Sequence, residues 1–310
     1  MSELLDVFGS TALYATAVRL ALPVLFAALG EVFAERSGLV NVGLEGMMLA
    51  GAFAGVLGAD LTGDPWAGAA LGILAAMLVA AIQATVAINL SGDQIVAGIA
   101  LNLAVVGATS FLARAIWEGG DVPQVEGFDS FSFPVLADIP ILGPIIFEQS
   151  ILVYVAILAS IVSWIFLLRT HWGLRLRSCG EDPRSADSLG ISVFGLRWQA
   201  MLICGALAGL GGVFLSLGQL FTFSDSMSGG RGYIALAVVI IARWSPLRAI
   251  WAALLFGIFE AVALRVQATD IDVPSELMLA LPYIVTLLVY AGVVGRSRPP
   301  KALGREYSRG

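Results

Sequence analysis

The sequence predicts an all-α fold, a polytopic integral membrane helix bundle of about nine spans (range eight to ten), some of them broken or re-entrant. Two observations carry this prediction. Of the 310 residues, 58% are hydrophobic and only 13% are charged, with a mean hydropathy of +0.90, whereas soluble domains are about 25% charged. In addition, apolar stretches approaching the roughly 20 residues that a spanning helix needs recur along the whole chain.

These apolar stretches, taken in order, mark the expected spans. We expect them at 11–30, 39–59, 65–88, 94–115, 150–168, 199–221, 232–242, 249–266 and 277–294. The stretch 232–242 is short, and the residues before it contain the pair Gly229–Gly230. Non-helical backbone at membrane depth survives only where protein or a wet cavity covers it. The segment 222–242 is therefore predicted to be a broken or re-entrant element beside a pathway.

The placement of arginine and lysine predicts the orientation in the membrane. No basic residue lies between Ala115 and Leu168, so the loop at about 116–149 is expected to be extracytoplasmic. The next loop, at about 169–198, is rich in arginine and is expected to be cytoplasmic, as is the basic C-terminal tail. Nine spans then place the N-terminus outside, and eight or ten would place it on the other side.

A very short helix is predicted inside the cytoplasmic loop, in the sequence GEDPRSADSLG (180–190). Asp182 suits the N-cap, where its carboxylate accepts an amide proton of the first turn. Pro183 suits the first helical position, and Gly190 suits the left-handed position after the last turn. A helix this short needs a surface to lie on. That surface is either the end of its own bundle, which makes it an ordinary connector, or a partner protein.

Polar side chains inside the expected spans are the candidate functional groups. Asn41 and Glu45 share one helix face, as do Asn102 and Thr109, and Gln94 opens the fourth span. Two interpretations are open, namely hydrogen bonds between packed helices and a polar path through the bundle. The ionisable Glu45 favours a path or a critical contact, because a charge at the membrane centre costs about 2.5–3.5 kcal/mol. Asn102 and Thr109 favour helix packing.

Two further charged residues lie within spans. Arg19 could extend to the membrane interface or pair with a carboxylate such as Glu45, and the sequence does not choose between these. Glu260 lies late in its span, five residues before Arg265, so we expect a local ion pair near the outer end.

Enzymatic and metal chemistry find little support in the sequence. There is no GxSxG elbow and no GxxxxGK[ST] loop, and the chain has one histidine, His171, and two cysteines, Cys179 and Cys204. We expect no catalytic residue, no metal site and no cofactor, and the chain is not expected to be an enzyme. A net charge of −6 gives no reason to expect a nucleic-acid partner. Any ATP-driven activity would need an ATPase on another polypeptide.

Several long stretches, in order along the chain, resemble the signatures of permease subunits of ABC importers. More narrowly, they are similar to the simple-sugar and nucleoside branch of the group that includes ribose and branched-chain amino acid permeases. The stretches are GEVFAERSGLVNVGLEGMMLAGAFAG (30–55), GDQIVAGIALNLAVVGATSFLAR (92–114), LRLRSCGEDPRSADSLGISVFGLRWQAMLICGALAGLGGVFLSLG (174–218), GRGYIALAVVIIARWSPLRAIWAALLFG (230–257) and LPYIVTLLVYAGVVGRSRPPKALG (281–304).

The resemblance implies a single permease domain over 1–310 in the plasma membrane, with a cytoplasmic C-terminus. It implies three protein partners: a cytoplasmic ATP-binding subunit, a second permease subunit expected to be a different chain, and an extracytoplasmic substrate-binding lipoprotein. The short helix would be the coupling helix that docks on the ATPase. Its expected contact residues match the family's loop pattern at Gly180, Glu181, Asp182, Pro183, Ala186 and Gly190, whereas Cys179 stands where a small apolar residue is expected.

The main functional prediction is therefore a permease that forms half of the pathway for a nucleoside or a simple sugar. Asn41, Glu45, Gln94 and Asn102 are the expected pathway residues. The alternative is an ion-coupled secondary transporter in which Glu45 carries the proton, and an intramembrane enzyme is disfavoured because no nucleophile–base pair is visible. The segments 37–46 and 228–237 both combine small residues with a break in spans of opposite direction, which suggests an inverted repeat.

Overall fold

The computed structural model describes residues 10–117, 121–132, 139, 143–267, 284 and 298–307. Its long elements are helices, and one short antiparallel pair of strands joins Ser130 to Ser150 and Ser132 to Glu148. In chain order the elements are α2 (Thr11–Arg36), α3 (Leu44–Thr62), α4 (Pro65–Ala84), η1 (Thr85–Asn89), α5 (Gln94–Ile116), β1 (Ser130–Ser132), η3 (Gly143–Phe147), β2 (Glu148–Ser150), α6 (Ile151–Arg169), α7 (His171–Glu181), α8 (Pro183–Ser188), α9 (Val193–Leu215), η4 (Ser216–Leu220), α10 (Arg231–Ile241) and α11 (Pro246–Gln267).

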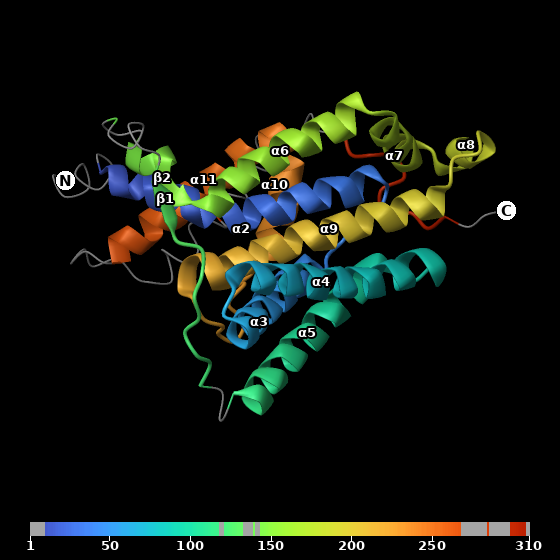
Figure 1. Cartoon of the computed structure of the whole chain (residues 1–310). Helices are drawn as coiled ribbons and strands as arrows, with labels where there is room; N and C mark the ends of the chain where they lie inside the picture. The colour runs from blue at the N-terminus through green and yellow to red at the C-terminus, as the bar shows by residue number, and fades with distance from the viewer. Residues whose placement is uncertain are drawn as a thin grey trace.

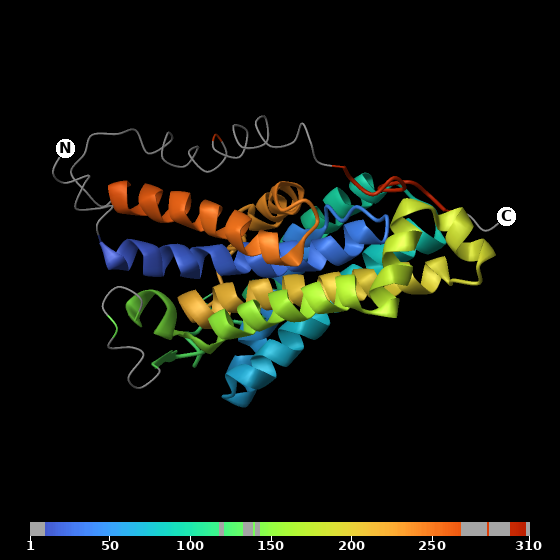
Figure 2. The same cartoon turned by 90° about the horizontal axis from the view of Figure 1, so that it is seen from above.

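The long helices form one bundle around α2 and α9, which pack side by side along its centre (Figures 1 and 2). Helices α6, α10 and α11 pack against α2, while α3 and α4 pack against α9. Helix α5 contacts mainly α3 and leans away from the bundle (Figure 1). The strands lie at one end, and α7 and α8 lie at the other (Figure 1). We call these the strand end and the α8 end.

The predicted spans agree with the helices. Within the described residues, seven helices are long and apolar enough to cross a membrane: Thr11–Arg36, Leu44–Thr62, Pro65–Asn89, Gln94–Ile116, Ile151–Arg169, Val193–Leu220 and Pro246–Gln267. The short stretch at 232–242 is the 11-residue helix α10, preceded by turns, so the broken element is confirmed. The expected span at 277–294 lies outside the described residues, apart from position 284.

Helix ends follow the residues that the sequence supplies. Asp64 caps α4 by accepting the Trp66 amide at 3.0 Å, and Asp93 caps α5 by accepting the Ile95 amide at 2.8 Å. Each cap satisfies amide protons that have no partner inside the helix. Pro65, at the first position of α4, needs no such partner. The turns between spans can therefore be very short.

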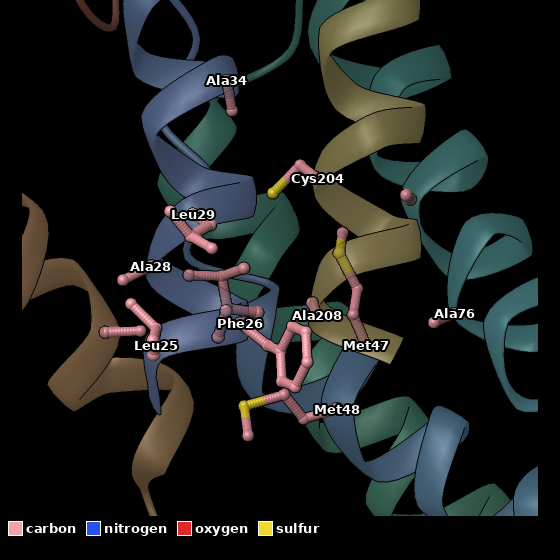
Figure 3. Packing of buried hydrophobic residues seen from close by; sticks show 14 of the residues in the cluster. Leu25, Phe26, Ala28, Leu29, Ala34, Met47, Met48, Ala76, Cys204 and Ala208 are labelled. Atoms are coloured by element: carbon pink, nitrogen blue, oxygen red, sulfur yellow. The ribbon is translucent and has the colours of Figure 1, made fainter. Parts of the chain in front are cut away.

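Small residues let the central helices pack closely. A methyl group built on Gly212 of α9 would lie 1.9 Å from the Met48 carbonyl oxygen of α3, and one on Gly257 of α11 would lie 2.2 Å from the Ala17 carbonyl oxygen of α2. Figure 3 shows the apolar cluster between these helices, with Phe26 of α2 near Met48 of α3. Close approach of backbones is how helices associate in lipid, where the hydrophobic effect gives little drive.

Several helix contacts in the first half of the chain have a counterpart in the second half, in which α2 and α9 exchange roles. Helix α4 packs on α9 as α11 packs on α2, and α3 contacts α9 as α10 contacts α2. The central pair is antiparallel, because Arg197 near the start of α9 donates to the Ser37 carbonyl after the end of α2. These contacts agree with an inverted repeat that relates α2 to α9 and α4 to α11, although α3 packs on α4 far more extensively than α10 packs on α11.

Candidate functional site

The chain between α2 and α3, residues 37–43, is non-helical and almost wholly buried, although it lies between two spans. Gly38 adopts a φ of +96°, a conformation that other residues rarely take. Buried backbone groups need hydrogen-bond partners, and outside a helix these come from other backbone segments and from side chains. Asn41, Gln94 and Asn102 each bond one backbone group of the break, at Gly43, Val40 and Val42 respectively. Glu45 lies directly after the break and bonds α10 instead.

Asn41 lies inside the break and is fully buried. Its amide donates to Glu31 Oε1 at 3.0 Å, and its Oδ1 accepts from the Gly43 amide at 3.0 Å. Its Nδ2 faces two sulfur atoms, Met47 Sδ at 3.4 Å and Cys204 Sγ at 3.3 Å. The side chain thus holds the break against α3 and α9, and the backbone amide holds it against α2.

Helix α5 supplies the next contacts. Gln94 Oε1 accepts from the Val40 amide at 2.7 Å. Asn102 Oδ1 accepts from the Gly46 amide at 2.8 Å, and Asn102 Nδ2 donates to the Val42 carbonyl at 2.9 Å. These two side chains replace hydrogen bonds that a continuous helix would have made.

Glu45 joins the two broken spans. It lies in the first turn of α3, and its carboxylate accepts from the Gly230 amide at 2.7 Å and from the Gly232 amide at 2.8 Å. The N-terminal turn of α10 offers unpaired amide protons and a partial positive charge, both of which a carboxylate satisfies. Glu45 therefore acts across 187 positions of sequence as the cap of α10.

Sequence reasoning missed three residues of this site. Glu31 and Glu35 of α2 are buried carboxylates; Glu31 contacts Asn41, and Glu35 accepts from the indole N–H of Trp244. The signal used for Glu45, an ionisable group inside an apolar span, would have found both. Tyr233 is 45% exposed, and its hydroxyl lies 2.9 Å from Asn102 Nδ2. No local pattern links Tyr233 to Asn102.

Two expectations about charged residues are settled by the structure. Arg19 does not pair with Glu45 and instead donates to Gln149 Oε1 at 2.9 Å, toward the strand end. The expected local pair of Glu260 was wrong, because Glu260 binds Arg231 at 2.5 Å. Arg231 lies in the first turn of α10, which packs beside α11. Its guanidinium therefore reaches Glu260, whereas Arg265, in α11 with Glu260, does not pair with it.

The short helix α8 is capped as predicted. Asp182 accepts from the Ser185 amide at 3.1 Å and from the Ser185 hydroxyl at 2.6 Å. These hydrogen bonds hold the pKa of the Asp182 carboxyl below its usual range, and the bond from the Ser185 hydroxyl has the larger effect. Pro183 begins the helix, and Gly190 follows it with a φ of +78°. Leu189, directly after α8, is 80% exposed and presents an apolar side chain beside the helix.

The loop that carries α8 is attached to the break. Gly180, at the end of α7, packs so closely on α2 that an added methyl group would lie 2.3 Å from the Arg36 carbonyl oxygen. Arg197 donates to the Ser37 carbonyl at 3.2 Å. Of the residues predicted to contact an ATPase, Gly180 is therefore buried against the start of the break, Ala186 is buried within α8, and Glu181 is exposed.

Burial makes the thiol of Cys179, next to this contact, a poor nucleophile, since it raises the pKa of the thiol to about 11. We expect a maleimide to leave Cys179 unmodified in the folded protein at pH 7.5 and to react after denaturation, with a native rate that rises as the pH approaches 11. Mass spectrometry of labelled peptides checks this. Rapid native labelling at neutral pH would contradict the packing of α7.

Within the described residues, no cluster of His, Cys, Asp or Glu could hold a metal ion.

A multi-pass bundle whose spans break at a buried polar junction has the architecture of a membrane transport protein. The chain belongs to the family described as branched-chain amino acid transport system / permease component, which matches residues 13–290. It is 39% identical to the guanosine ABC transporter permease protein NupQ of Bacillus subtilis, over 94% of each chain. It is 37% identical to the nucleoside ABC transporter permease protein NupC of Lactococcus lactis, over 92% of this chain and 93% of the relative.

A third relative, from Haloferax volcanii, is provisionally named a glucose ABC transporter permease protein and is 36% identical over 97% of this chain and 98% of its own. No solved structure matches. The chain is a permease subunit of an ABC transporter and hence a transport component. None of these relatives supports the alternative of an ion-coupled carrier that uses Glu45.

Proposed function

We propose that this chain is one permease domain, over 1–310, of an ATP-driven importer that takes up a nucleoside. It forms half of the translocation pathway and docks through α8 on a cytoplasmic ATP-binding subunit. A second, different permease chain supplies the other half, and an extracytoplasmic lipoprotein delivers the solute. The α8 end and the C-terminus then face the cytoplasm of the cell. A simple sugar is the second candidate solute, favoured by the name of the Haloferax relative.

One observation carries the coupling half of this proposal. The exposed helix α8 is rooted in α7, and α7 touches Arg36 and Gly38 through Gly180. A partner that displaces α8 would therefore displace the start of the break at 37–43. Because Glu45 binds the first turn of α10, the second broken span would follow. This route links an ATPase to both broken elements through direct contacts.

The substrate half rests on the names of two relatives and on the polar groups at the break. Asn41, Gln94 and Asn102 are proposed to shape the pathway wall by fixing the backbone of 37–46. Glu45 is proposed to shape it by holding the first turn of α10 against α3. Tyr233 offers a partly exposed ring beside Asn102, and a nucleobase can stack on such a ring. A neutral solute is favoured, because Arg231, two residues before Tyr233 in α10, is already paired with Glu260.

The test is purification of the tagged chain from its native membrane in mild detergent, with mass spectrometry of the partners and uptake of labelled nucleosides in cells. We expect a stoichiometric ATP-binding subunit and a second permease. Replacing Asp182 with alanine removes the cap of α8 and is expected to lower uptake about fivefold. Asp182→Asn keeps a capping oxygen and is expected to behave as wild type, with equal membrane levels for both variants.

The outcomes separate the alternatives. A chain that purifies alone, under conditions that preserve other membrane complexes, would contradict the proposal. Loss of glucose uptake, with nucleoside uptake intact, on deleting the chain would assign the sugar as the solute. Equal uptake in the alanine and asparagine variants would remove α8 from the coupling route, because only its cap distinguishes them.

A further inference from the structure

The C-terminal segment Arg298–Tyr307, which we call the strap, crosses the α8 end of the bundle and runs beside α7 and α8 (Figures 1 and 2). Its backbone joins two parts of the proposed coupling route. The Ala302 amide donates to the Gly180 carbonyl at 2.9 Å, and the Gly304 amide donates to the Gly38 carbonyl at 3.0 Å. The strap is thus bonded on one side to the loop that carries α8 and on the other to the break.

Side chains fix the strap in place beyond these two bonds. The Tyr307 side chain is buried, with its ring centroid 5.6 Å from that of Phe194 on α9 and 6.0 Å from the Arg197 guanidinium carbon. Arg197 also reaches the Arg305 carbonyl at 3.5 Å. Ala302 is buried as well. The strap is therefore packed firmly on this surface, at Ala302 and Gly304 in its middle and at Tyr307.

A cleft of about 810 Å³ lies between the strap and the end of α7, where Glu181 lines it. The strap supplies three cations to this cleft, Arg298, Lys301 and Arg305, against the one carboxylate of Glu181, so the cleft is basic. The adjoining cleft at the start of α8, of about 580 Å³, is balanced in charge, because Arg184, Lys301 and Arg305 face Glu181, Asp182 and Glu306. A basic cleft favours an acidic occupant and steers its approach.

We propose that the basic cleft is the second half of the docking surface for the ATP-binding subunit and receives an acidic segment of it. The inference rests on the proposed function, since it takes the partner from there, but it adds a surface that the coupling helix alone does not provide. Two features select this partner. The basic cleft adjoins the start of α8, the helix proposed to dock on the ATPase, because the two clefts share Glu181, Lys301 and Arg305. Its two sides meet at Gly180, which precedes Glu181 in α7 and accepts the Ala302 amide of the strap. The docked subunit would then move α8 and the strap as one body.

The proposal is tested with the permease pair in lipid nanodiscs and the purified ATP-binding subunit. The variant Lys301→Glu/Arg305→Glu reverses the charge of the strap wall while keeping Ala302 and Tyr307. We expect about tenfold weaker binding at physiological salt, with a larger difference at low salt. The matched control, Arg243→Glu/Arg248→Glu, makes the same change of charge at Arg243 in the turn after α10 and at Arg248 in the first turn of α11, and is expected to bind as wild type.

A second measurement does not depend on affinity. A photoactivatable maleimide placed on Arg305→Cys is expected to form an adduct with the ATP-binding subunit, whereas one on Arg248→Cys is not. The native cysteines do not interfere, because Cys179 and Cys204 are buried. Unchanged binding together with no adduct from position 305 would overturn the inference, as would equal losses in the strap variant and its control. Adducts with lipid alone would instead assign the cleft to anionic headgroups and would also overturn it.

These outcomes are distinguishable from a failure of the proposed function. If wild type binds no ATP-binding subunit, the proposed function itself fails. If wild type binds and Asp182→Ala weakens binding while the strap variant does not, the coupling helix stands and only the strap is excluded. Thermal unfolding of each variant in the nanodisc is expected to match wild type, because the reversed side chains are exposed.

Discussion

The variant Glu45→Gln should fold poorly, and Glu45→Ala should fold worse still. Both carboxylate oxygens of Glu45 accept amide protons, one from Gly230 and one from Gly232. Glutamine offers one acceptor and turns an NH₂ group toward the other amide, and alanine offers none. Hydrogen bonds to a charged group contribute about 1.5–3 kcal/mol each, and a buried donor left without a partner costs a similar amount. We expect the free energy of unfolding to fall by about 3 kcal/mol in Glu45→Gln and by more in Glu45→Ala.

The measurement uses protein solubilised in detergent and analysed by size-exclusion chromatography after heating. It gives the yield of monodisperse protein and the midpoint temperature of its thermal unfolding. Glu181→Gln is the matched control, since it makes the same chemical change on an exposed carboxylate, and it is expected to leave the midpoint unchanged. A Glu45→Gln protein that folds as wild type, and whose transport loses only its response to pH, would contradict the capping role. That result would support the alternative in which Glu45 carries a proton during transport.

The described fold was largely predictable from local sequence. Spans follow from apolar length, and the caps of α4, α5 and α8 follow from an aspartate directly before each helix. The break before α10 was predictable too, because its helix is short and the pair Gly229–Gly230 precedes it. In each case the deciding atoms lie within a few residues of one another, so composition and spacing are enough.

The polar junction was predictable as a set of residues but not as an arrangement. Its partners are far apart in sequence, with 54 positions between Gln94 and Val40 and 131 between Asn102 and Tyr233. Tertiary packing decides which of them meet. For the same reason Glu260 paired with Arg231 and not with its local neighbour. Sequence reasoning treated these groups as open to the solute, whereas their first task is to satisfy a buried non-helical backbone.

Gly180→Ala is expected to uncouple ATP hydrolysis from transport. The added methyl group would lie 2.3 Å from the Arg36 carbonyl oxygen and 3.0 Å from its carbon, and these are backbone atoms that cannot rotate away. Alanine favours a helix over glycine by up to about 1 kcal/mol, but overpacking of this kind costs about 1–3 kcal/mol. The clash is expected to win, and α7 would separate from the start of the break. Transport should fall while the ATP-binding subunit still docks, because α8 and its cap are untouched.

Reconstituted vesicles with the full complex measure both activities at once, as solute uptake and phosphate release. Gly107→Ala is the matched control, since it makes the same substitution in the middle of α5, where an added methyl group meets nothing within 4 Å. Helix propensity then acts alone, and the control should be neutral or slightly stabilising. A Gly180→Ala complex that keeps its ratio of uptake to hydrolysis would show that the motion of α8 reaches the pathway by a route other than Arg36 and the break. If hydrolysis persists and uptake is lost, then the contact between Gly180 and Arg36 transmits the motion, since Gly180 is buried and the variant changes no exposed side chain of α8.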